Sequence, residues 1–543
     1  MKRFKLYSGM AAVCAMLTLA SCGNDIELTE AQAPAKGEYK VTFTASQESS
    51  ATRTAVDGSN VVWQSGDAIT VFDGGGNNRT FELATGAGET TGQFEGTLQT
   101  LTPKKYCAVY PLAPNAQLAG GDVVVSDAPI ADAPASDYTI TGLVLPVEQV
   151  ATRDGFDPQA AIMTARNDDA NKIVNENEDL SLGAFKHVCA FVKVTTTEEY
   201  DRITFTANGG DSIAGGFDAQ VGADGISKAI PTSPSCTVSL VPAAGSTKIA
   251  AGTYFIAILP GILEEGFTMS CTSVDNDNKE VTTMVRSYSD RTQAFSRHNA
   301  VNMGTVEEGV TAATWTRNTQ KYVDLGLTSG TKWATCNVGA TTPTDYGDYF
   351  AWGETSPKNF YDWSNYKWCD GTENVMTKYN ANSSYGDVDG RTVLEPADDA
   401  AHRNWGGIWR MPTYQEFEEL KSECYWEWTE GYGSTSVKGY IVYQVQPNAD
   451  DDKGKKKTPQ DTDVTPVGSY SINVDNHIFL PAAGFYQYNS NNTVDRALDY
   501  WGASLGVRNN TNQSRYAYNL FCSSYWDYSG SRFVGESVRP VLK

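Results

Sequence analysis

Residue types that bind metals or act as catalysts occur in the chain, but not at the spacings of a known active site. The four histidines, His187, His298, His402 and His477, are scattered, and none belongs to a Ser/His/Asp or HExxH pattern. The cysteines form no CxxC pair and no cluster with histidine of the zinc-binding kind. We therefore expect no enzyme activity, no metal centre and no cofactor.

One cysteine stands where covalent lipid chemistry would be expected. Lys2, Arg3 and Lys5 precede an apolar run at residues 9–20, and the run ends in the letters LASC at Cys22. This layout is typical of a secretory signal, and the apolar run is too short to span a bilayer as a helix. The four letters resemble the bacterial lipobox. That resemblance implies cleavage before Cys22 and attachment of diacylglycerol to its thiol; the alternative is an ordinary signal peptide with an incidental cysteine.

Eight further cysteines remain after the signal segment. An even number in an exported protein permits disulfides, but buried free thiols are an equally good interpretation. For the four in the C-terminal part we prefer a disulfide, with three connectivities open: Cys336, Cys369, Cys424 and Cys522.

Aromatic side chains concentrate in the C-terminal part of the chain, where ten of the twelve tryptophans follow residue 316. Two stretches dense in aromatic residues, 360–371 and 523–531, are predicted to be loops. Exposed tryptophan can stack on a sugar ring or act as a binding hot spot for a protein. We expect Trp363, Trp368 and Trp526 to be exposed and to bind a ligand. The alternative, that such rings fill a small core, holds for most of the others.

The elements that would position these residues are mostly strands. The letters YKVTFTA at residues 39–45 alternate apolar and polar side chains, as a half-buried strand does. Many more short strands follow up to residue 306, separated by turns and without a long helical pattern. The formal net charge of −23 disfavours binding to nucleic acid, whose phosphates attract lysine and arginine. The fold class is mainly β.

Residues 38–306 resemble the fimbrillin family of Bacteroidetes pilus proteins. Four segments carry the resemblance in order: 52–74, 185–194, 252–261 and 299–306. It implies two tandem antiparallel β-sandwich domains. It also implies assembly by strand exchange, in which a protease cuts after an arginine and a neighbouring subunit supplies the missing strand. Arg53 in the letters SSATRTAV is the expected cleavage site; the alternative is an ordinary exposed loop arginine.

The C-terminal part resembles the family of Fibrobacter succinogenes major paralogous domains. Five segments carry this resemblance: 322–340, 347–354, 409–420, 479–486 and 537–542. It implies an α+β unit of the C-type-lectin-like fold. Thr413 and Glu416 predict a capping box at the start of a helix there. We do not expect calcium at the letters DVDGR (387–391), which lack the later ligands of an EF-hand loop, or at EPADD (395–399).

These observations predict a cell-surface lipoprotein, anchored in the outer membrane through Cys22, that acts as a tip or accessory pilus subunit with a C-terminal adhesin domain. Its partners would be other pilus subunits and a glycan or protein ligand. The alternative is a surface glycan-binding lipoprotein that never polymerises. The predicted divisions are a signal peptide at 1–21, a tether at 22–38, β-sandwiches at 39–180 and 181–306, a linker at 307–320 and the C-type-lectin-like domain at 321–543.

Overall fold

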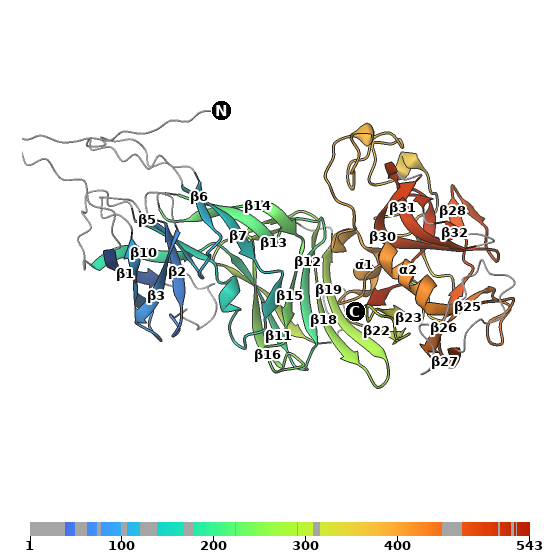
Figure 1. Ribbon diagram of the computed structural model, residues 1–543, viewed down its shortest axis with the longest axis horizontal. Helices are drawn as coiled ribbons and strands as arrows, with labels where there is room; N and C mark the ends of the chain where they lie inside the picture. The colour runs from blue at the N-terminus through green and yellow to red at the C-terminus, as the bar shows by residue number, and fades with distance from the viewer. Residues whose placement is uncertain are drawn as a thin grey trace, which may run out of the picture.

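A computed structural model shows three units in a row, coloured blue, green and orange to red in Figure 1. It describes residues 39–48, 62–72, 78–98, 106–119, 138–167, 179–222, 224–289, 292–307, 315–447, 470–508, 511–522, 526–527 and 529–543. Strands dominate these residues, so the predicted mainly β fold class is confirmed. No helix in these ranges is long and apolar enough to cross a membrane.

The first unit is a closed barrel, where the sequence predicts a sandwich. The barrel closes because its first strand pairs on both sides, with β4 and with β10. Trp63 fills the interior, with edge-to-face contacts to Phe94, Tyr110 and Phe185. The barrel strands in spatial order are β1 (Tyr39–Gln47), β10 (Asp179–His187), β9 (Met163–Asn167), β5 (Tyr106–Tyr110), β2 (Ala68–Phe72), β3 (Asn78–Thr85) and β4 (Thr91–Leu98).

The second unit packs several sheets around one large apolar core. One sheet contains β14 (Ser227–Ser235), β13 (Ala214–Val221), β7 (Tyr138–Leu145) and β6 (Gln117–Ala119). A second contains β16 (Gly252–Ile258), β11 (Ala190–Thr196) and β21 (Ala300–Val306), and β17 (Gly261–Leu263) pairs with β20 (Gln293–Phe295). A third sheet begins with β8 (Glu148–Val150), β15 (Thr237–Val241), β12 (Arg202–Ala207), β18 (Gly266–Asp275) and β19 (Glu280–Ser289).

The chain passes between these two units more than once. Strands β6, β7 and β8 belong to the second unit, although β9 and β10 return to the barrel, next to a 3₁₀ turn at η1 (Pro158–Ala160). The chain leaves the barrel after β10 and enters β11 at Ala190. The domain limits given above stay predictions.

The third unit combines two sheets with short helices. The larger sheet contains β29 (Ser490–Asn492), β28 (Phe485–Gln487), β34 (Gly535–Ser537), β30 (Leu498–Arg508), β31 (Thr511–Cys522), β32 (Trp526–Asp527), β24 (Tyr349–Phe350) and β33 (Gly530–Ser531). The smaller contains β25 (Cys424–Thr429), β26 (Gly439–Pro447) and β27 (Tyr470–Pro481). The helical elements are η2 (Trp363–Asn365), η3 (Ser383–Tyr385), η4 (Pro396–Asp398), α1 (Ala400–Trp405) and α2 (Tyr414–Glu423).

The predicted capping box is present at the start of α2. The Thr413 side chain accepts from the Glu416 backbone N–H, and the Glu416 carboxylate accepts from the Thr413 N–H at 2.8 Å. Arg410 donates to the same carboxylate, with Nη1 2.8 Å from Oε2. Burial alone would raise the pKa of Glu416, but the Arg410 hydrogen bond and charge lower it to about 2. The helix start therefore carries a fixed negative charge at neutral pH.

The predicted linker at 307–320 is partly a strand. β22 (Thr316–Val323) pairs with β19 of the second unit and with β23 (Lys332–Ala334), which in turn pairs with β35 (Val541–Leu542). One sheet of eight strands therefore runs from the second unit into the third (Figure 1). The edge of β19 offers backbone groups that β22 pairs with, and the linker at 307–320 stays a prediction.

Candidate functional site

Strand β1 is built into the barrel along its whole length. It pairs with β4 from Tyr39 opposite Leu98 to Ser46 opposite Thr91, and in parallel with β10. Val41, Phe43 and Ala45 point inward and are fully or almost fully buried, as the alternation predicts. β1 therefore fills a groove that two other strands and the barrel core define.

The deepest contact of β1 is made by Phe43. Its ring centroid lies 4.9 Å from that of Phe81 and 5.2 Å from that of Tyr106, both edge-to-face. Aromatic pairs of this geometry add to the energy of burial. The groove therefore contains an aromatic pocket at its centre.

An ion pair holds the exit of β1. Glu48, the residue after the strand, lies 2.7 Å and 3.0 Å from the two terminal nitrogens of Arg297, and its Oε2 lies 2.9 Å from His298 Nδ1. Arg297 also donates to the carbonyl of His187 at 3.1 Å. Burial alone would raise the pKa of Glu48, but hydrogen bonds from His298 and Arg297 outweigh it and hold that pKa well below its ordinary value. The end of β1 is thus fastened to the second unit.

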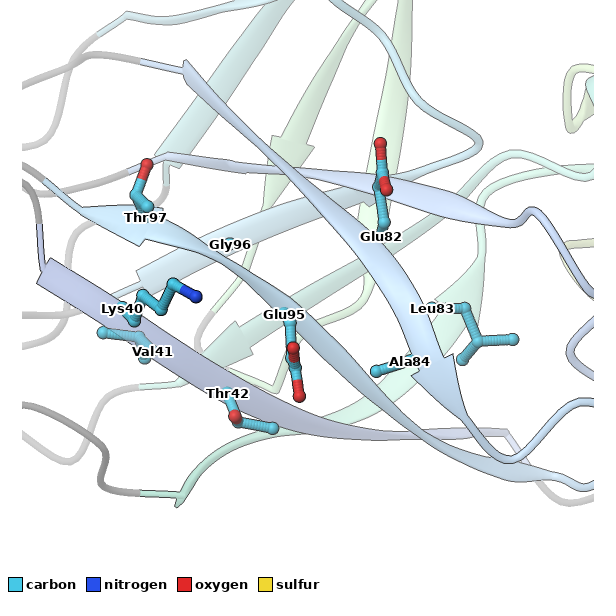
Figure 2. Close-up of a pocket in the computed structure, with 9 residues that line it drawn as sticks. All are labelled: Lys40, Val41, Thr42, Glu82, Leu83, Ala84, Glu95, Gly96 and Thr97. Atoms are coloured by element: carbon cyan, nitrogen blue, oxygen red, sulfur yellow. The ribbon is translucent and has the colours of Figure 1, made fainter.

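The outer surface of the same strands forms a shallow polar groove of about 480 Å³, drawn in Figure 2. Lys40 and Thr42 of β1 line it together with Glu95 of β4 and Glu82 of β3. Glu82 and Glu95 stand directly opposite each other on neighbouring strands. Since β1 supplies one wall, the groove depends on β1 staying in place.

Two of the predicted site residues cannot be placed. Cys22 and Arg53 lie outside the described residues, so lipid attachment and cleavage stay predictions. Arg53 is separated from the end of β1 at Gln47 by five residues, of which Glu48 is described.

Trp363 and Trp368 are half-buried, not fully exposed as the sequence predicts. The Trp363 ring lies 4.9 Å from that of Phe533, between centroids. Trp368 donates from Nε1 to the Gly353 carbonyl at 2.7 Å, and the Nζ atoms of Lys367 and Lys378 lie 4.4 Å and 4.9 Å from its ring centroid. Both tryptophans pack against the core of the third unit.

Trp526 begins β32, opposite Cys522, and its side chain is outside the described ones. The ligand-binding role of the three tryptophans stays a prediction.

The acidic motifs at 387–399 use their carboxylates within the fold. Asp389 accepts from the backbone N–H groups of Tyr379 at 2.7 Å and Asn380 at 2.9 Å. Glu395 and Asp398 each lie 2.6 Å from Lys378 Nζ. Among the described residues, no group of three or more His, Cys, Asp and Glu side chains is arranged to hold a metal ion.

The preferred disulfide in the third unit is not formed. No disulfide joins the eight described cysteines, and of Cys336, Cys369, Cys424 and Cys522 only Cys369 is not buried. Burial raises the pKa of the Cys522 thiol to about 11, so this group stays protonated at neutral pH. These cysteines contribute to the core as small apolar side chains.

The large sheet of the third unit contains a group of buried polar side chains that was not predicted from the sequence: Asp499, Asn519 and Glu536. The available signal is an acid inside an apolar run, as in the letters ALDYW around Asp499 and FVGESV around Glu536. Burying such an acid is costly without a partner, so its presence inside a strand needs an explanation.

No family model matches the chain, and no curated protein matches it. Three solved structures show a partial likeness. A candidate cell adhesion protein of Bacteroides ovatus ATCC 8483 is 14% identical, with a TM-score of 0.31, over 53% of this chain and 96% of that one. A candidate cell adhesion protein of Bacteroides fragilis NCTC 9343 is 11% identical, with a TM-score of 0.26, over 52% and 97%. A shaft pilin of Lactobacillus rhamnosus GG is 11% identical, with a TM-score of 0.17, over 50% and 97%.

Proposed function

We propose that this protein is a subunit of a surface fibre of the pilus type, assembled by exchange of strand β1, with the third unit as its ligand-binding adhesin part. In the precursor, the lipid on Cys22 anchors the chain in the outer membrane. Cleavage after Arg53 separates the anchor and β1 from the rest, and a strand of a neighbouring subunit takes the place of β1. The role is one of binding, without catalysis.

The observation that carries this proposal is the position of β1 relative to Arg53. Cleavage after Arg53 would cut the only peptide connection between β1 and the chain that follows it. Loss of β1 would leave unpaired backbone groups along β4 and β10 and empty the pocket around Phe43. Such a groove is satisfied by an incoming strand with apolar side chains at alternate positions.

A place at the tip or in an accessory position fits the third unit better than a place in the shaft. β35 is held in a sheet by β23, so it is engaged within the fold and does not offer a donor strand. A large docked unit would also crowd a closely repeating stalk.

The test is limited cleavage of the folded, full-length protein with a trypsin-like protease, followed by mass spectrometry and size-exclusion chromatography. We expect a cut after Arg53, release of the fragment that contains β1 and formation of higher oligomers. Arg53→Ala should prevent all three. Arg153→Ala removes a different exposed arginine and serves as the matched control, which should behave like the wild type.

The ion pair of Glu48 favours one alternative, a surface glycan-binding lipoprotein that keeps β1 permanently. Arg297 and His298 bind Glu48, directly after the end of β1. Such contacts would stabilise a strand that stays in place permanently. An intact, lipid-bearing N-terminus on the protein extracted from the cell surface would establish this alternative and reject strand exchange.

A further inference from the structure

Three polar side chains meet on one face of the large sheet in the third unit. Trp501 of β30 stands opposite Asn519 of β31, and Asp499 lies two residues before Trp501, so it shares that face. Tyr500 stands opposite Ser537 in the parallel pair of β30 and β34, which places Glu536 beside Asp499. Asn519 Nδ2 donates to Glu536 Oε1 at 3.0 Å, in agreement with this register.

These side chains are buried without a full set of partners. Glu536, Asp499 and Asn519 are 1%, 2% and 4% exposed. Oε2 of Glu536 and Oδ1 of Asn519 have no hydrogen-bond partner among the described residues, and both atoms can act as acceptors. Buried acceptors of this kind are rare in folded proteins and are costly when left unpaired.

Within the part of the chain that the structure describes, no positive side chain neutralises the two acids. A cavity of about 280 Å³ opens beside them, and neither lysine nor arginine is among the described residues that line it. Burial raises the pKa of Glu536 and of Asp499 well above the ordinary values, and the Asp499 charge raises that of Glu536 further. A positive group placed in the cavity would favour ionisation of both acids.

The walls of the cavity are aromatic. Phe485, Phe521 and Phe533 line it, with Ser529 and Ser531 as further polar residues. Gly530 lies against Glu536, since a Cβ there would stand 2.7 Å from Glu536 Oε1. Aromatic faces attract cations, and a site with acceptors on one side and rings on another suits a small cationic group.

We propose that this pocket binds the primary ammonium group of a ligand, with the Glu536 and Asp499 carboxylates and the Asn519 carbonyl oxygen as acceptors. The inference deepens the binding role proposed for the third unit and rests on that role, but it does not depend on strand exchange. An amino sugar and a lysine side chain carry the same group. Calcium would need six or more oxygen ligands, more than these three side chains supply.

The test measures binding to the full-length protein by calorimetry, with two pairs of probes that differ in one charge. Glucosamine is compared with N-acetylglucosamine, and N-α-acetyl-lysine amide with the same compound acetylated also at Nε. We expect the charged member of at least one pair to bind about tenfold or more tightly than its neutral partner. The pair that shows the difference identifies the source of the ammonium group.

Glu536→Gln and Asp499→Asn separate a binding role from a structural one. Each should weaken binding of the charged probe by about tenfold or more, while the melting temperature stays the same or rises because an uncompensated buried acid is removed. Glu430→Gln removes an exposed acid that directly follows β25, a strand of the smaller sheet of the same unit, and should leave binding unchanged. Equal binding of charged and neutral probes, no binding of any probe, or a lower melting temperature in both pocket variants would overturn the proposal. Oligomers after Arg53 cleavage would still form in those cases, so the two proposals fail separately.

Discussion

His187 is a histidine held neutral by its surroundings. It lies at the end of β10, is buried, and contacts the rings of Phe156, Phe191 and His298. Its Nδ1 has no hydrogen-bond partner among the residues that the structure describes. Burial, with smaller effects from the charges of His298 and Arg297, lowers the pKa of His187 to about 3, and the Glu48 charge offsets only part of this. Protonation of this ring therefore opposes folding.

We predict that His187 makes the protein less stable as the pH falls. Its pKa is about 3 in the folded state and about 6.5 in the unfolded chain, so between these values the unfolded state binds more protons. The contribution of neutral His187 to the free energy of unfolding is complete above pH 6.5. Below that pH it declines by up to about 1.4 kcal/mol per pH unit. In His187→Leu, the free energy of unfolding from urea titrations should fall less steeply between about pH 6.5 and 4.5.

His402 gives the same experiment its internal control. Burial, aided by the Arg403 charge, lowers the pKa of His402 to about 4, so it adds a slope of the same sign in both proteins. The difference between wild type and His187→Leu therefore isolates His187. Identical slopes in the two proteins would contradict the prediction.

At the scale of elements, β1 and the start of α2 could be predicted from the sequence, because each is determined by a pattern of a few neighbouring residues. Alternation at Val41, Phe43 and Ala45 identifies the buried face of β1, and Thr413 with Glu416 identifies the start of α2. Local patterns of this kind do not depend on which strand lies next to which.

The missed features depend on pairing between distant segments. Asp499 and Glu536 become neighbours only through the register of β30 with β34, which neither segment reveals alone. Part of the segment expected to be a linker forms β22, because it pairs with the edge of β19, an earlier strand of the second unit. The exposure of Trp363 was also misjudged, since its partner Phe533 comes from the other end of the unit.

Phe43 should determine how firmly β1 is held in its groove. It is fully buried, and Phe43→Ala should lower the free energy of unfolding by about 3–5 kcal/mol because a large cavity remains. After cleavage at Arg53, the β1 fragment of this variant should dissociate faster than that of the wild type, as followed by size-exclusion chromatography. Thr42→Ala changes the neighbouring, outward-facing position of the same strand and should have a small effect. Equal release rates for the two variants would show that the aromatic pocket does not hold the strand.

At the scale of the whole molecule, the second and third units are joined by more than β22. Helix α1 and the turn after it pack against the second unit, with His402 Nε2 of α1 3.2 Å from Thr206 Oγ1 of β12 and the Gly407 N–H of the turn donating to Ser270 Oγ of β18 at 3.1 Å. Arg403 also donates to Thr268 Oγ1 at 2.7 Å. A third unit fixed in this way would transmit a pulling force to the rest of the molecule without a flexible joint.

Gly407 is the position where this junction is tightest. Its φ is +62°, and a Cβ there would stand 2.0 Å from Thr272 Oγ1 and 3.0 Å from Thr283 Oγ1. Gly407→Ala should therefore force the two units apart and destabilise the junction by about 1–3 kcal/mol. Calorimetry should show one joint transition for these units in the wild type and two separate transitions in the variant.

Gly433→Ala provides the matched control for this junction. Gly433 has nearly the same backbone conformation, with φ of +60°, but no atom lies within 4 Å of an added Cβ. It therefore carries the backbone strain of a left-handed alanine, about 1 kcal/mol, without a clash. If both variants lower the melting temperature equally and keep a single transition, the close contact at Gly407 does not couple the units. If only Gly407→Ala splits the transition, the third unit is held rigidly by the sheet face it covers.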